Sequence, residues 1–194
     1  MASTDADAKI SVTPEVFAFI SYDSNEIADV LRDVAARLDI ANPIRLEVDE
    51  TTPLGKMSAR LLDGDGTVIS GPASSDATLG VRDESGALED TTRFTNVTRR
   101  RASISHGRIQ LRARVRLRAD YADVAPDEQL SLSENAAWDA YCAGRLDRAG
   151  FEPNKQRFRY NFRNRFGFSD AVDAIFDELW DADDLGWDDL PRAS

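Results

Sequence analysis

The stretch RIQLRARVRLRADY, residues 108–121, carries the most regular pattern in the chain. Apolar residues occupy every second position from Ile109 to Ala119, and arginine fills most of the positions between them. Successive side chains of a β-strand point to opposite faces of its sheet, so this alternation predicts a strand with one apolar and one arginine face. We expect this strand to be the central or longest one of the fold.

The composition indicates a globular protein with a single good core or a core plus a helical subdomain. Of its 194 residues 42% are hydrophobic and 30% are charged. No apolar run is long enough to span a bilayer, and the start MASTDADAK lacks the pattern of a signal peptide. We therefore expect a cytoplasmic protein with no membrane partner. One cysteine and one histidine exclude an internal disulfide and a typical structural zinc site, and we expect neither metal nor cofactor.

Charge is distributed in blocks of alternating sign. The net charge is −11, yet residues 99–119 contain eight arginines and no acid, while residues 169–194 contain nine acids and one arginine. Blocks of opposite sign can neutralise one another within a fold.

Several elements are expected before the arginine stretch. A capping pattern at residues 23–26 precedes an apolar stripe from Ile27 to Leu38, which predicts an amphipathic helix. Within residues 10–22 the apolar run VFAFI, residues 16–20, fits a buried strand, and a helix starting at Pro14 is the alternative. Further strands are expected within residues 44–48, 56–62 and 67–70, the last two joined by an Asp-Gly-Asp-Gly turn. Residues 71–90 are expected to form a long connection, and residues 93–105 an extended segment that pairs with the arginine strand.

Three helices are expected in the C-terminal part. A capping box at residues 131–134 starts the first helix, and Ser169 caps the last one. Residues 155–166 fit a helix by the spacing of their phenylalanines and a strand by their alternation. The expected fold class is α+β, with a mainly antiparallel sheet, an N-terminal helix and about three C-terminal helices. The expected organisation is a disordered terminus at 1–9, a sheet domain at 10–125 and a helical segment at 126–194 packed on it as one structural unit.

Catalytic motifs are absent from the sequence. It contains no nucleophile elbow, no Walker motif and no dinucleotide fingerprint. Two enzyme hypotheses of the small-hydrolase type remain open. One needs a Cys142–His106 pair, and the other needs a carboxylate cluster formed by Glu47, Asp49, Glu50, Asp63 and Asp65. A buried structural cysteine and an Asp-Gly turn explain these residues better, so we name no catalytic residue.

The arginines are the candidate binding residues. Guanidinium groups spaced about 7 Å apart along one strand face would match a row of phosphates or carboxylates. The candidates are Arg112, Arg114, Arg116 and Arg118 on the predicted strand, and Arg157 and Arg159 among the aromatic residues of 155–166. Internal pairing with the acidic segments is the preferred interpretation of the arginine face, ahead of a protein or peptide partner and of nucleic acid.

The sequence thus favours a non-catalytic module that binds a protein or peptide partner or associates with itself. The alternatives are the small hydrolase described above, and binding of nucleic acid or a phosphorylated ligand through the arginine strand.

Overall fold

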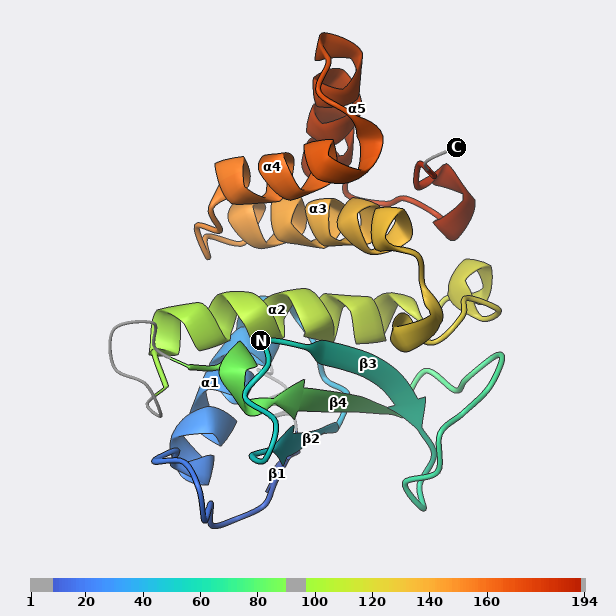
Figure 1. Cartoon of the computed structure of the whole chain (residues 1–194). Helices are drawn as coiled ribbons and strands as arrows, with labels where there is room; N and C mark the ends of the chain where they lie inside the picture. Colours follow the sequence, from blue (N-terminus) through green and yellow to red (C-terminus); the bar gives the residue numbers. More distant parts are fainter. Residues whose placement is uncertain (1–8, 90–96, 193–194) are drawn as a thin grey trace, which may run out of the picture.

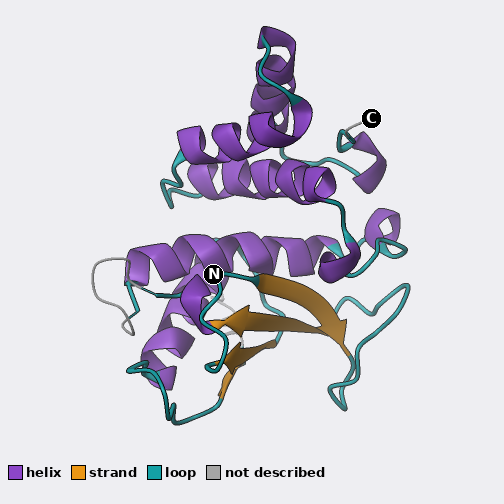
Figure 2. Ribbon diagram, in the orientation of Figure 1, coloured by secondary structure: helices purple, strands orange, loops and turns teal. Residues whose placement is uncertain are grey.

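The computed structural model describes residues 9–89 and 97–192, and these contain four strands and five α-helices (Figures 1 and 2). Their order is β1 (Ile10–Thr13), α1 (Ser24–Arg37), β2 (Ile44–Asp49), β3 (Met57–Leu62), β4 (Thr78–Glu84), α2 (Arg99–Val115), α3 (Leu132–Arg148), α4 (Lys155–Phe166) and α5 (Asp170–Asp181). The α+β class is therefore confirmed, with one helix more than the sequence predicted.

The four strands form a mixed sheet in the order β1-β2-β4-β3, and the prediction of a mainly antiparallel sheet was wrong. Strands β1, β2 and β4 are parallel neighbours, and only β3 runs antiparallel to β4. The reason is the connection between β1 and β2. It contains the whole of α1, and a helical crossover returns the chain parallel to the strand it left.

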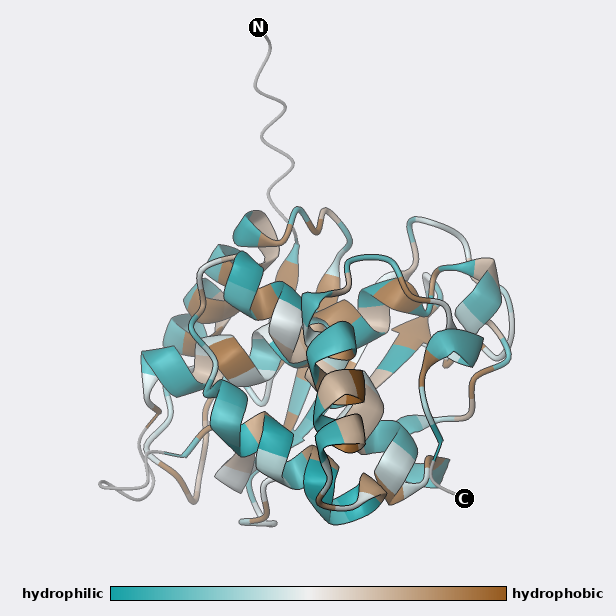
Figure 3. Ribbon diagram, turned by 90° about the horizontal axis from the view of Figure 1, so that it is seen from above, coloured by the Kyte–Doolittle hydropathy of each residue, from teal (hydrophilic) through white to brown (hydrophobic). Residues whose placement is uncertain are grey.

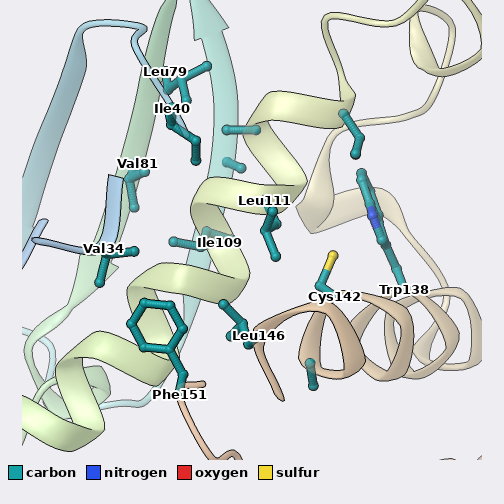
Figure 4. Close-up of a cluster of buried hydrophobic side chains, with 14 of the residues drawn as sticks. Val34, Ile40, Leu79, Val81, Ile109, Leu111, Trp138, Cys142, Leu146 and Phe151 are labelled. Atoms are coloured by element: carbon teal, nitrogen blue, oxygen red, sulfur yellow. The ribbon is translucent and has the colours of Figure 1, made fainter. Parts of the chain in front are cut away.

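The predicted central strand at 108–121 was also wrong, because residues 99–115 form helix α2. This helix lies between the sheet and α3, so opposite sides of it are buried. Figure 4 shows Ile109 on the side of Val34 and Val81, and Leu111 on the side of Cys142. A helix buried on opposite sides loses the single apolar stripe of a surface helix, and its apolar residues can then fall on alternate positions.

Other differences concern the N-terminal half. Residues 16–20 form neither the predicted buried strand nor the alternative helix, and Val16 and Phe19 are exposed. The strand β1 lies earlier, at Ile10–Thr13, and β4 forms inside the expected long connection. Residues 67–70 form no strand and contribute one isolated bridge, between Leu62 and Val68. The extended segment expected at 93–105 is helical from Arg99 onward, and its residues 93–96 lie outside the described part, as do residues 1–8 of the expected disordered terminus.

The remaining helices follow their local signals. Asp23 is the N-cap of α1, and Ser131 forms a complete capping box with Glu134 at the start of α3. Residues 155–166 are a helix, which decides between the two alternatives, and Ser169 caps α5. These helix starts can be predicted from a few neighbouring residues, because a capping side chain accepts hydrogen bonds from the free N–H groups of the first turn.

The elements stack in layers, with the sheet below α2, α3 on the far side of α2, and α4 and α5 on α3 (Figure 1). Hydrophilic and hydrophobic residues alternate along the helices, as expected for helices with buried and exposed sides (Figure 3). The core runs from Leu46 on β2 through Ile109 to Trp138 and Phe176. Among the described residues, no helix combines the length and apolar character that a membrane span requires.

Candidate anion-binding cleft

Two of the predicted binding arginines lie inside the protein. The side chain of Arg112 is 3% exposed, and one of its nitrogens lies 2.9 Å from Asp139. Arg116 lies 2.7 Å from Asp127 and donates to the carbonyl oxygens of Val124 and Ala125. Both guanidinium groups also lie over the ring of Trp138, at 4.7 and 4.9 Å. These arginines connect α2 to α3 and to the segment between the two helices.

Three further candidates are also bound within the chain. Arg114 donates to the carbonyl of Leu38 at the end of α1, at 2.6 Å. Arg118 pairs with Asp120 and Asp184. Arg159 pairs with Asp177 of α5 at 2.5 Å.

The sixth candidate, Arg157, differs from these five. It is exposed, and none of the described residues forms an ion pair or a side-chain hydrogen bond with its guanidinium group. Acids of α5 pair with Lys155, Arg159 and Arg163 of α4. Within 108–118, all arginines except Arg114 pair with acids from other parts of the chain.

The carboxylates considered for an enzyme are not brought together. Strand β3 is antiparallel to β4, whereas β2 is parallel to it. Glu50 therefore follows β2 near the carboxyl end of β4, and Asp63 follows β3 near the amino end of β4. Asp63 accepts hydrogen bonds from the backbone of its own turn, and Glu50 accepts from the N–H groups of Ala18 and Phe19. No group of three metal-ligating side chains occurs in the described ranges.

Cys142 and His106 also face different partners. His106 lies on the sheet side of α2 against Asp83 of β4, whereas Cys142 lies on α3 beside Leu111 (Figure 4). Burial raises the pKa of the Cys142 thiol to about 12, so the thiol stays protonated at neutral pH. The structure thus gives this cysteine the environment of a core residue.

A cleft of about 430 Å³ lies where the first turns of α2 and α4 approach each other, and we call it the α2–α4 cleft. Its charged lining is Arg100, Arg101, Arg108, Arg157, Asp139 and Glu152. Its apolar lining includes Met57, Ile104 and Phe158. Four guanidinium groups against two carboxylates give the lining a positive balance, in a protein whose net charge is −11. This volume lies within the usual range of ligand sites, about 300–1,000 Å³.

The topology explains the position of the cleft. Ala87 lines it just after the carboxyl end of β4, and Met57 lines it at the adjacent start of the antiparallel strand β3. In open sheets with parallel strands, ligands bind beyond the carboxyl ends of the strands, because the loops and helix starts gather there.

The wall of the cleft contains a fixed arginine. Arg108 lies 2.5 Å from Asp139, which Arg112 also approaches at 2.9 Å. Burial acts to lower the pKa of Arg108, but Asp139 outweighs it, so the pKa is raised and the guanidinium stays charged. Burial acts to raise the pKa of Asp139, and the two arginines lower it below its usual value. Arg108 is therefore held in place as a half-buried cation.

The mouth of the cleft contains Glu152, in the loop between α3 and α4. Its backbone has a φ of +51°, which is uncommon for a residue other than glycine. Buried Phe151 and Pro153 flank it, and Arg37 donates to the preceding carbonyls at 2.9 and 2.8 Å. These contacts hold Glu152 where its carboxylate lies 3.9 Å from Arg100.

The two helices that begin at the cleft have basic first turns. Arg99, Arg100 and Arg101 open α2, and Lys155 and Arg157 lie in the first turn of α4, with no acid in either turn. The first turns of α1, α3 and α5 contain acids. Cations near a helix N-terminus interact unfavourably with its dipole, whereas an anion there is stabilised, so an anionic ligand would offset this arrangement.

The sequence indicated only part of this cleft. Arg157 was among the named candidate residues. Arg100, Arg101 and Arg108 were considered only as part of the arginine face of the two predicted strands. Three successive arginines without an acid could have marked the start of α2, but the strand prediction assigned them to an extended segment.

No protein family model, no curated protein and no solved structure matches the chain.

Proposed function

We propose that the protein is a non-catalytic module that binds a peptide or protein partner through an anionic group of that partner, held in the α2–α4 cleft. The observation that carries this proposal is the gathering of four guanidinium groups on one cleft of an acidic protein. Two of them, Arg101 and Arg157, form no ion pair or side-chain hydrogen bond with any described residue.

Exposed apolar residues next to the cleft support a partner larger than a single ion. Leu54, which is 54% exposed, precedes the lining residue Gly55. On α4, Tyr160 is 59% exposed, and its ring lies 6.1 Å from that of the equally exposed Phe168. A polar site bordered by exposed apolar side chains is typical of a surface that binds a protein.

The arginines that suggested nucleic-acid binding do not form such a surface. Arg112 and Arg116 are buried, and Arg114 donates to Leu38. Of the six candidate arginines, Arg157 is the one with no ion pair or side-chain hydrogen bond to a described residue, and it lines the cleft. The cleft is a local site and not an extended track along a polyanion.

Binding of a labelled acidic peptide tests the proposal. A fluorescein-labelled peptide of glutamate and leucine should increase its anisotropy on addition of the protein at low salt, whereas a lysine–leucine peptide should not. Arg157→Gln should weaken binding about three- to tenfold, because a charge-assisted hydrogen bond contributes roughly 1 kcal/mol or more.

Matched substitutions outside the cleft provide the control. Arg165→Gln changes an exposed arginine of the same helix that does not line the cleft, and it should leave the affinity within twofold. Equal losses in the two variants would show general charge attraction and would contradict a site in the cleft, as would the absence of any binding.

A further inference from the structure

We propose that the group accepted by the α2–α4 cleft is a doubly charged phosphomonoester and not a carboxylate, so that the partner is phosphorylated. This inference rests on the proposed function of the cleft and adds the chemistry of the ligand.

The charges that line the cleft leave two arginines without a counter-ion. Arg108 is paired with Asp139 at 2.5 Å, and Arg100 faces Glu152 at 3.9 Å. Within the described part of the chain, no carboxylate pairs with Arg101 or Arg157. Two uncompensated positive charges match a phosphomonoester, which carries a charge of about −1.5 to −2 at pH 7, better than a carboxylate with a single charge.

The location of Arg101 and Arg157 on different helices also favours a phosphomonoester. Arg101 lies in the first turn of α2 and Arg157 in the first turn of α4, so these two lining residues come from separate helices. One guanidinium fork can satisfy both oxygens of a carboxylate. A phosphomonoester has three terminal oxygens and can accept hydrogen bonds from two guanidinium groups at once. A carboxylate can also contact two guanidinium groups, as Asp139 does with Arg108 and Arg112, but its single charge balances only one of them. A phosphomonoester carries enough charge to balance both arginines.

The apolar part of the cleft lining suits the organic group to which the phosphate is attached. Ile104, Met57 and Phe158 provide apolar surface next to the arginines. A phosphate attached to an apolar or aromatic body would place the body on this surface, whereas free inorganic phosphate would leave it uncovered. A phosphorylated side chain of a peptide has this construction.

Two small probes with the same ring test the inference. Phenyl phosphate and benzoate should both bind to the full-length protein by calorimetry at pH 7.5, with phenyl phosphate at least tenfold tighter. Arg101→Gln and Arg157→Gln should each reduce this preference to about threefold or less. The controls are Arg99→Gln and Arg165→Gln, which lie in the same helices outside the cleft lining and should preserve it.

Lowering the pH gives a second readout. The second proton of a phosphomonoester binds near pH 6, so the affinity for phenyl phosphate should fall several-fold between pH 7.5 and 5.0. The charged side chains that face a ligand in the cleft are the carboxylates of Asp139 and Glu152 and the guanidinium groups of Arg100, Arg101, Arg108 and Arg157. Benzoate keeps its charge over this range, and its affinity should change less than twofold.

The outcomes separate the two proposals. If neither probe binds, the proposed function fails and this inference with it. If both bind with equal affinity, or if phenyl phosphate binds equally well at both pH values, the cleft binds anions but does not select a phosphomonoester. In that case the present inference alone is overturned.

Discussion

The imidazole Nε2 atom of His106 lies 3.4 Å from Oδ2 of Asp83, and both side chains are fully buried between α2 and β4. Burial raises the pKa of Asp83 well above its usual range and lowers the pKa of His106 to about 3. The native pair therefore holds one proton over a wide range of pH.

Because of this pair, we expect the free energy of unfolding to decrease as the pH rises above 6.5. In the unfolded chain the two groups together hold one proton only between about pH 4 and 6.5. Above pH 6.5 the unfolded chain loses this proton, whereas the native protein keeps it up to the raised pKa of Asp83. The free energy of unfolding should then decrease by up to about 1.4 kcal/mol per pH unit. Urea unfolding at pH 5.5, 6.5, 7.5 and 8.5 measures this slope.

The variant Asp83→Asn should reverse the direction in which this pair makes the stability depend on pH. Only His106 then titrates, and the unfolded chain binds a proton below pH 6.5 that the native imidazole does not accept until about pH 3. Relative to the unmodified protein, the variant should lose stability as the pH falls below 6.5. Above pH 6.5 its free energy of unfolding should decrease less steeply. Identical pH profiles for both proteins would contradict the proposed titration of this pair.

Asp127 connects three parts of the fold, and its removal should be costly. Its carboxylate lies 2.7 Å from Arg116, accepts a hydrogen bond from the N–H of Ala59 on β3 at 2.8 Å, and lies 3.7 Å from Arg112. Asp127→Ala removes the carboxylate paired with buried Arg116, while Arg112 keeps Asp139, so we expect a loss of about 3–5 kcal/mol in urea unfolding.

Asp184→Ala provides the comparison for Asp127→Ala. Asp184 also pairs with an arginine of the 108–118 stretch, Arg118, but its side chain is 82% exposed. An exposed ion pair contributes at most about 1 kcal/mol, so this variant should lose less than that. Similar losses in the two variants would show that burial of Asp127 has no special effect.

Gly144 marks the closest approach of α3 to the end of α5. A Cβ atom at this position would lie 1.9 Å from the carbonyl oxygen of Trp180. Gly144→Ala should therefore push the helices apart and cost at least about 2 kcal/mol in thermal or urea unfolding. Gly64→Ala, where nothing lies within 4 Å, should change stability by no more than about 0.5 kcal/mol.

The Cys142 thiol should be unreactive in the native protein. It is buried and its pKa is raised to about 12, so the thiolate that reacts with iodoacetamide is scarce. Labelling followed by mass spectrometry should be slow in buffer and complete within minutes in unfolding concentrations of urea. Rapid labelling of the folded chain would indicate an open environment around α3.

Local signals predicted the helices better than the strands. The caps at Asp23, Ser131 and Ser169 each lie at the start of a helix, because a capping side chain bonds to N–H groups only two or three residues away. Strand β4 was not predicted, since it contains Gly80 and the buried Asp83 within a stretch rich in turn-forming residues. Its hydrogen bonds come from β2 and β3, which are distant in sequence.

The candidate cleft could be predicted only in part for the same reason. Arg157 was marked by the alternation of arginine and aromatic residues in α4. Arg100 and Arg101 acquire their role because the chain brings the first turn of α2 next to the first turn of α4, more than fifty residues later. The sequence does not show which arginines have counter-ions, because the partners of Arg112 and Arg116 come from other segments.

The sequence by itself determined the α+β class, helix α1, strand β2, helices α3 and α5 and the charge blocks, since these depend on periodicity, caps and composition. Only the tertiary structure decided that residues 99–115 form a helix. Its alternating apolar residues fit a helix buried between the sheet and α3 as well as they fit a strand, and contacts with both layers select the helix. The same packing buries Arg112 and Arg116 against acids and leaves the α2–α4 cleft with arginines that can meet a partner.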